Sequence, residues 1–190
     1  THCIEAYTVQ LHQPITDALA LKGISMIAEN LEKAYENGED REARRNMMIA
    51  STIGGMAFIS SNVGAVHAFA ETVGAWFDTP HGVANSLFLP YIMEFNIPAC
   101  PERFADIADA MGIEREESMS DEQYALKAVE YVKALNRKLN IPTIKEIKGI
   151  TEERFEAIAE RSANNVLSND NARKITKEDY LELLKKAYNE

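Results

Sequence analysis

The stretch "IGGMAFISSNVGAVHAFAETVGAWFDTPHGVAN", residues 53–85, decides the fold class of this chain. Residues 53–77 are apolar on nearly every side of a helix and rich in glycine, alanine and serine, which let neighbouring backbones approach closely. A helix without a polar face is surrounded by other helices, so these residues predict the central helical hairpin of a buried core. The helix that carries His67 is expected to end near Trp76, and a new helix is expected to start at His81 after the turn at residues 78–80.

Helical patterns continue on both sides of this stretch. Apolar residues recur at helical spacing from Ile4 to Leu11, and a longer helix is predicted from Thr16 to a stop at Gly38. Clear start signals or apolar periodicity predict further helices within residues 38–52, 100–112, 120–140 and 176–190.

The chain lacks strand signals. It has no run of alternating β-branched residues, no Asn-Gly or Asp-Gly turn between such runs, and no alternation of strands with helices. The predicted fold class is therefore all-α, a helical bundle-like domain. Residues 1–190 are expected to form one domain, with a soft break only where Pro142 and Gly149 bracket a loop.

Composition excludes several function classes. With 20 basic and 30 acidic side chains the net charge is −10, which argues against nucleic acid or an anionic membrane as partner, because both select basic patches. Cys3 and Cys100 lie far apart without a CxxC motif, so neither a disulfide framework nor a thiolate metal site is encoded. A cytoplasmic protein, neither secreted nor membrane-spanning, is expected. The chain begins with Thr1 and not with an initiator methionine, so it is interpreted as a piece of a longer chain.

Two of the four histidines, His67 and His81, lie in the most apolar part of the chain. Taken singly, His67 is a core histidine bonded to a backbone carbonyl, and His81 opens a helix after a proline turn. Taken together, the turn folds His81 back toward His67, and two imidazoles converging in an apolar pocket are typical of a divalent metal site. His2 is the candidate third ligand, whereas His12, beside a helix end, is expected on the surface.

Spacing argues against other histidine chemistry, because no HExxH, adjacent His-Asp pair or Glu-x-x-His occurs. Two alternatives stay open. One is a stand-alone helical interaction domain with an incidental histidine cluster. The other is a metal-dependent hydrolase in which three histidines hold a metal-bound hydroxide and Glu71 is the general base.

Several motifs resemble the signature of a known family, the iron-containing (group III) alcohol dehydrogenases. They are the Gly-Met-Ala-Phe run at 55–58, the Val-His-Ala helix at 66–68, the Pro-His-Gly-Val turn at 80–83 and "THCIEAYTV" at the start. The tail "NARKITKEDYLELLKKAY" is similar to the family's closing Asn-Pro-Arg segment and last helix, with Ala172 in place of the proline. The resemblance covers essentially the whole chain.

The resemblance implies one half of a two-domain enzyme. In the family an N-terminal α/β domain binds NAD or NADP, and an all-helical C-terminal domain, of a fold shared with dehydroquinate synthase-like proteins, supplies the metal site. This chain is similar to the second domain alone, without the nucleotide-binding domain. Family members hold the metal with an aspartate and three histidines. His2, His67 and His81 match the histidines, and the aspartate would stand four residues before His2, outside this chain.

For function, the resemblance implies that the complete enzyme interconverts alcohols with aldehydes or ketones by hydride transfer, with a divalent metal, Fe²⁺ in the family, as Lewis acid. The expected partners are a small alcohol or aldehyde, the missing domain and further copies in a homo-oligomer. Glu71 stands where many members carry a histidine, and it is a candidate proton acceptor if burial raises its pKa. The isolated chain is expected to be inactive, and to bind Zn²⁺ or Ni²⁺ in preference to Fe²⁺ because it lacks the carboxylate ligand.

Overall fold

The computed structural model describes all 190 residues and contains no strand, so the all-α prediction is confirmed. The α-helices are α1 (His2–Thr8), α2 (Pro14–Glu36), α3 (Arg41–Ser61), α4 (Ala65–Phe77), α5 (His81–Asn96), α6 (Pro101–Ala110), α7 (Asp121–Lys138), α8 (Phe155–Ala163) and α9 (Lys177–Asn189). Short 3₁₀ segments are η1 (Ile97–Ala99), η2 (Ile144–Glu146), η3 (Glu152–Arg154) and η4 (Val166–Asp170).

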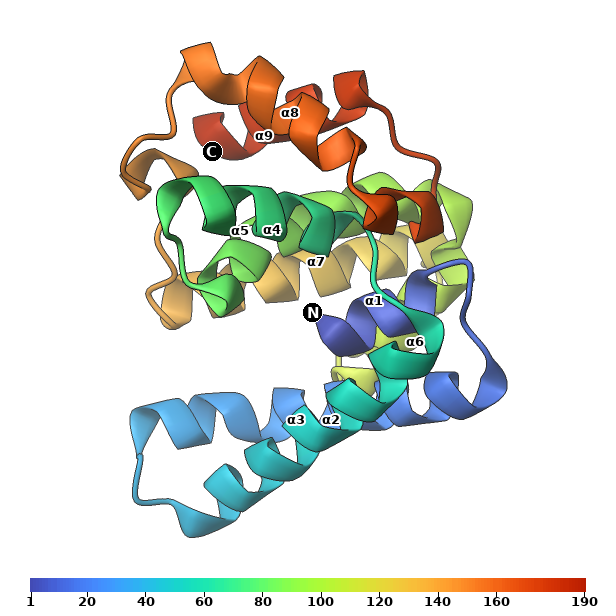
Figure 1. Ribbon diagram of the computed structural model, residues 1–190. Coiled ribbons are helices and arrows are strands. Elements are labelled where there is room, and N and C mark those ends of the chain that lie inside the picture. Colours follow the sequence, from blue (N-terminus) through green and yellow to red (C-terminus); the bar gives the residue numbers. More distant parts are fainter.

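The helices are arranged in tiers (Figure 1). α8 and α9 cover one side of a middle tier that is formed by α4, α5 and α7. On the other side α2 and α3 form a long antiparallel hairpin, and α1 and α6 connect this hairpin to the middle tier. The N-terminus lies near the centre of the molecule, between the hairpin and α4 and α5.

Local sequence signals placed several helix ends correctly. Ser120 and Thr176 begin α7 and α9 with the predicted capping boxes, in which side chain and backbone bond reciprocally across the first turn. Pro101 lies in the first turn of α6. Gly112 follows that helix with a φ of +76°, a left-handed conformation that glycine adopts without a steric penalty. Each of these signals acts within a few residues of the chain.

The prediction of a central hairpin within residues 53–77 is wrong. α3 and α4 are bent by 107° at the break between them, where Asn62 has a φ of +73°. The end of α3 therefore leaves the core, and Met56 and Ile59 are 54% and 78% exposed. The hairpin forms instead between α4 and α5, through a turn in which Asp78 is left-handed. No single helix is long and apolar enough to cross a membrane, and α3 and α4 pass that test only as a bent pair.

The core runs continuously from α1 to α9 as one cluster of 39 buried apolar residues. Phe69 of α4 stacks on Phe88 of α5, with ring centroids 4.2 Å apart, and meets Tyr180 of α9 edge-on at 4.6 Å. Such aromatic pairs stabilise a core by about 0.5–1.5 kcal/mol beyond their buried area. This packing holds α4, the helix that carries His67, between α5 and α9.

The C-terminal third contains two features that the sequence pattern did not reveal. α8 begins without a side-chain cap, so the sequence contains no start signal for this helix. It packs into the core through Phe155 and Ile158. The loop bracketed by Pro142 and Gly149 is present, but Ile144 within it is buried. This loop is therefore packed against the core through Ile144.

The crossing of α1 and α2 depends on Gly23. A Cβ atom at this position would lie 2.5 Å from Sγ of Cys3 and 3.3 Å from Cγ2 of Ile53. Cys3 is only 3% exposed, so its thiol has little room to move away. The approach of α1 to the α2–α3 hairpin therefore requires a residue without a side chain at this point.

Gly23→Ala is expected to lower the free energy of unfolding by about 1–3 kcal/mol, because the added methyl group overpacks this crossing. Gly55→Ala on α3 is the matched control, since no atom lies within 4 Å of its Cβ position. The control is expected to gain about 0.5–1 kcal/mol, because alanine favours the helix over glycine. Urea denaturation measures both values, and equal effects of the two substitutions would show that Cys3 does not obstruct the methyl group.

Candidate metal centre

The three histidines singled out in the sequence lie together, each near the start of a helix. His2 begins α1, His67 lies in the first turn of α4, and His81 begins α5. Candidate ligand nitrogens of the three rings lie within 4.8 Å of one another. The ring centroids of His2 and His67 are 4.7 Å apart, and those of His67 and His81 are 5.3 Å apart. The turn before His81 thus folds it toward His67, as the sequence predicts.

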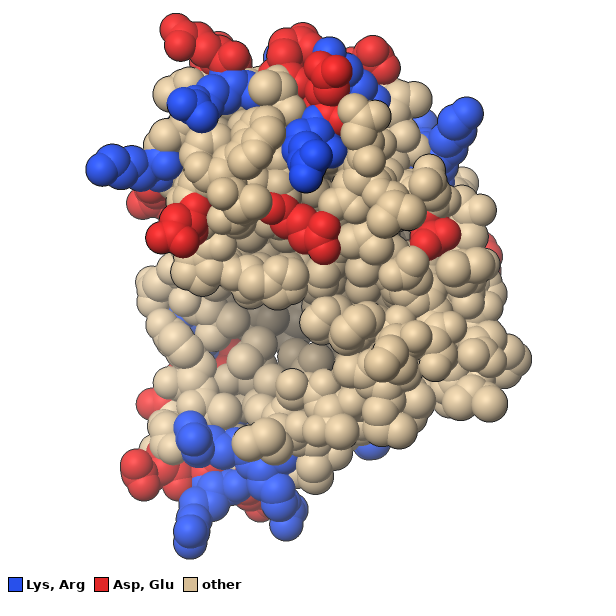
Figure 2. Space-filling model, viewed as in Figure 1, with Lys and Arg blue, Asp and Glu red and all other residues tan.

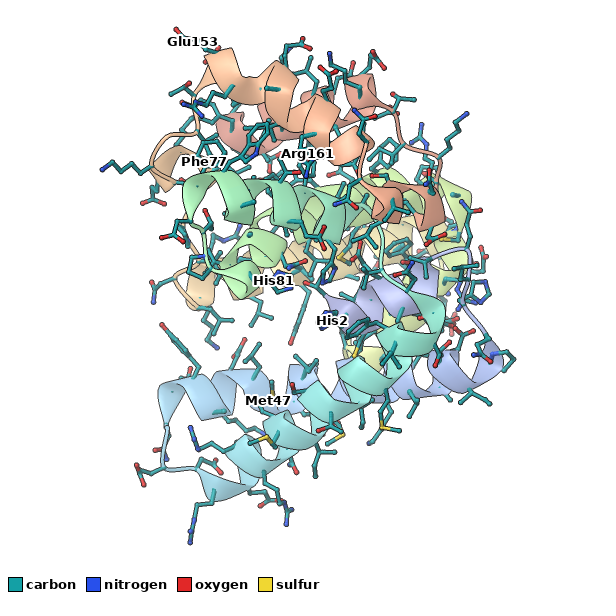
Figure 3. All side chains as sticks on the ribbon, viewed as in Figure 1. His2, Met47, Phe77, His81, Glu153 and Arg161 are labelled. Atoms are coloured by element: carbon teal, nitrogen blue, oxygen red, sulfur yellow. The ribbon has the colours of Figure 1, made fainter.

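The three rings differ in their surroundings. His67 is buried, His2 is half-buried and His81 is exposed, and Figure 3 shows His2 and His81 facing the space between the tiers. Phe58 covers one side of His2, with ring centroids 4.2 Å apart. Burial, reinforced by His67, the amino terminus and His81, lowers the pKa of His2 from its ordinary 6.5 to about 4. His2 is therefore a neutral imidazole at neutral pH, the form that binds metal ions.

His67 has one bonded ring nitrogen and one without a partner. Nδ1 lies 2.5 Å from Oε2 of the buried Glu5, so its partner is a carboxylate and not the backbone carbonyl of an ordinary core histidine. Nε2 is buried and makes no hydrogen bond. A buried polar atom without a partner costs about 1–3 kcal/mol. An ion at this nitrogen would remove that cost, so the residues present fit a metal ion held by the three imidazoles.

Asn85 lies one turn after His81 and was not singled out in the sequence. Its Nδ2 is 3.2 Å from Nε2 of His81 and donates to the backbone carbonyl of His81 at 3.0 Å. Its Oδ1 is buried without a hydrogen-bond partner. The one sequence signal for this contact is the four-residue spacing from His81, which places both side chains on the same helical face.

Two residues named in the sequence lie outside the cluster. Glu71 is exposed, and its carboxylate accepts a hydrogen bond from Nδ2 of Asn165 at 2.7 Å. The burial that a role as proton acceptor requires is thus not present in this chain, and the role stays a prediction. His12 lies on the surface, as expected, 3.4 Å from a carboxylate oxygen of Asp17.

The start of α4, which presents His67, is held by a buried pair of amides. Oδ1 of Asn171 accepts the backbone N–H of Ala65 at 3.3 Å. Asn171 and Asn96, both buried, also donate to each other at 2.7 and 3.0 Å. Gly64 permits this approach, because a Cβ atom there would lie 3.0 Å from Oδ1 of Asn171. The C-terminal tail therefore positions a helix that begins more than a hundred residues earlier in the chain.

The face that opens toward the histidines carries few charges. Figure 2 shows basic and acidic side chains around α8 and at the tip of the α2–α3 hairpin, and acidic side chains along the edge of the middle tier. Below this edge the surface is hollowed and carries few charged side chains, although the chain has a net charge of −10.

The structure is thus an all-helical domain with three convergent histidines, one of which has a buried nitrogen without a partner. The family model for the C-terminal part of the Fe-containing alcohol dehydrogenases matches residues 1–188. The chain belongs to the iron-containing alcohol dehydrogenase family and corresponds to the C-terminal half of its members. The resemblance noted in the sequence is thereby confirmed.

Individual relatives agree with this assignment. Alcohol dehydrogenase 4 of Saccharomyces cerevisiae is 41% identical over 191 residues, covering 99% of this chain and 48% of the relative. The NADPH-dependent butanol dehydrogenase of Clostridium saccharobutylicum is 38% identical, with the same coverage. A solved 1,3-propanediol oxidoreductase, 37% identical, has a TM-score of 0.94 over 98% of this chain and 49% of its own. The chain thus spans about half the length of the relatives it matches.

Asn171→Ala is expected to lower the free energy of unfolding by about 1–3 kcal/mol, because it leaves the amide of Asn96 and the N–H of Ala65 unpaired in the interior. Thermal unfolding followed by circular dichroism measures the change. The control is Asn169→Ala, an exposed residue two positions earlier in the chain, which is expected to change the stability by less than about 0.5 kcal/mol. A loss no larger than that of the control would mean that the amide pair does not hold α4.

Proposed function

We propose that this chain is the metal-binding half of a nicotinamide-dependent alcohol dehydrogenase. His2, His67 and His81 hold a divalent ion, and the complete protein interconverts small alcohols with aldehydes or ketones. The observation that carries the proposal is the buried, unpaired Nε2 of His67 beside two further imidazoles, in a chain of the iron-containing alcohol dehydrogenase family. Relatives named as butanol and 1,3-propanediol dehydrogenases support a small alcohol as substrate.

When bound, the ion supplies a Lewis acid for the oxygen of an alcohol or a carbonyl compound. The protein's part is to present the imidazoles in a fixed arrangement. Glu5 orients the His67 ring, Phe58 restrains His2, and the exposed His81 lies where the site opens toward solvent. The hollow beside the rings, with few charges, suits a small organic substrate.

The hydride acceptor is a nicotinamide cofactor, bound by a nucleotide-binding domain outside residues 1–190. One relative is named as NADPH-dependent and another as an NAD-dependent methanol dehydrogenase, so both cofactors occur among the relatives of this half. The isolated chain is accordingly inactive as a dehydrogenase. We place the complete protein in the cytoplasm, where the free thiols of Cys3 and Cys100 stay reduced, and expect it to associate with further copies of itself.

Removing one imidazole is expected to lower the affinity for a divalent ion by more than about 100-fold, because loss of an outer partner alone costs about 10–100-fold. Anaerobic Co²⁺ titration, followed by absorption, compares His67→Ala with His12→Ala, which leaves the three rings intact. In the complete protein, His67→Ala is expected to abolish alcohol-dependent reduction of NAD or NADP, and His12→Ala to preserve it.

Unchanged Co²⁺ binding by His67→Ala would contradict the proposed metal centre and favour a helical interaction domain. Metal-dependent cleavage of an ester or a phosphoester by the isolated chain would favour the three-histidine hydrolase.

The isolated chain is expected to bind Zn²⁺ or Ni²⁺ more tightly than Fe²⁺. Three neutral imidazoles without a carboxylate resemble catalytic zinc sites, and divalent affinities generally rise from Fe²⁺ to Ni²⁺. Anaerobic competition titrations of the three ions measure the order. Fe²⁺ binding that equals or exceeds Zn²⁺ binding would show that the missing carboxylate does not set the preference.

A further inference from the structure

A single buried carboxylate joins the helices of two candidate ligands. Glu5 lies on α1 three residues after His2, is 3% exposed, and reaches the first turn of α4. Its Oε1 accepts the backbone N–H of Val66 at 2.8 Å. Its Oε2 lies 2.5 Å from Nδ1 of His67. The same side chain therefore binds the backbone of α4 and the imidazole that α4 presents.

The charge of this carboxylate is compensated by the end of a helix. No lysine or arginine contacts it, and the one basic side chain beside it is the imidazole of His67. Burying a charge is costly unless hydrogen bonds or dipoles replace water. α4 is a 13-residue helix whose N-terminal N–H groups and dipole favour a negative charge at this place. Gly64 allows the contact, because a Cβ atom there would lie 3.1 Å from Oε1 of Glu5.

The contact with Glu5 selects one tautomer of a neutral His67 ring. The ionised carboxylate only accepts hydrogen bonds, so the Nδ1 atom that faces it carries the proton in the neutral ring. Nε2 then keeps its lone pair, and this is the buried atom that has no partner in the protein. A ligating histidine commonly donates its other N–H to a carboxylate, which fixes the ring and raises its basicity.

We propose that Glu5 is a positioning residue of the metal centre, holding His67 in the Nδ1–H tautomer and directing its free Nε2 at an ion shared with His2 and His81. The inference rests on the metal centre proposed above. Because Glu5 and His2 share α1, the contact also sets the separation of the His2 and His67 rings, whose centroids are 4.7 Å apart.

Glu5→Gln separates this role from simple anchoring of α4. The glutamine has nearly the same shape, but it offers one acceptor and one donor where the carboxylate offers two acceptors. If its oxygen accepts from Val66, its amide donates to Nδ1 of His67, and the imidazole proton must move to Nε2. The substitution is therefore expected to reverse the tautomer while α4 stays in place.

The experiment measures tautomer and affinity separately. ¹⁵N NMR of the metal-free chain is expected to show the Nδ1–H form of His67 in the parent and the Nε2–H form in Glu5→Gln. Co²⁺ titration is expected to give about 10- to 100-fold weaker binding in Glu5→Gln. Glu130→Gln, at an exposed position of α7, is the matched control and is expected to match the parent in both measurements.

A second variant covers the case in which Glu5→Gln fails to fold. Glu5→Asp keeps the negative charge at α4 but is one methylene too short to bind both partners. It is expected to retain the helical circular dichroism spectrum and to bind Co²⁺ about 10-fold more weakly.

If the folded Glu5 variants keep both the parent tautomer and the parent affinity, the positioning role is overturned and the metal centre stands. If the parent itself binds no Co²⁺, the metal centre is overturned together with the positioning role.

Discussion

The contact between Glu5 and the first turn of α4 is the constraint on which the histidine cluster depends. Its carboxylate is bonded to the backbone of Val66 and to the ring of His67, and it lies at the N-terminal end of α4 without a lysine or arginine partner. This arrangement requires α1 to lie across the start of α4. Because α1 also carries His2, burial of one charge brings two imidazoles together.

A second constraint acts on the same helix from the other end of the chain. The amides of Asn171 and Asn96 bond to each other and hold the N-terminus of α4, and Gly64 leaves room for Asn171 and Glu5 side by side. Further along α4, Phe69 is packed between α5 and α9. The helix that presents the most buried histidine is thus held along much of its length, as a site of fixed geometry requires.

The firm placement of the histidine cluster suits a domain that supplies one half of the proposed active centre. The helices contribute three candidate imidazole ligands and a hollow with few charges, and relatives of the family are about twice as long as this chain. The proposed hydride transfer needs a nicotinamide ring beside the substrate, and residues 1–190 hold the candidate metal ligands. Of the three candidate ligands, His81 is the exposed one.

The sequence by itself determined the helical class, the ends of α6, α7 and α9, and the return of His81 toward His67, because periodicity, capping boxes and a short turn act over a few residues. It also carried the family signature. Only the tertiary structure decided that α3 bends away from α4, leaving Ile59 exposed, and that Glu5 is the partner of His67. Such choices depend on how helices pack in three dimensions, and Glu5 and His67 are 62 residues apart in the chain. The spacing of residues along one helix carries no information about its neighbours.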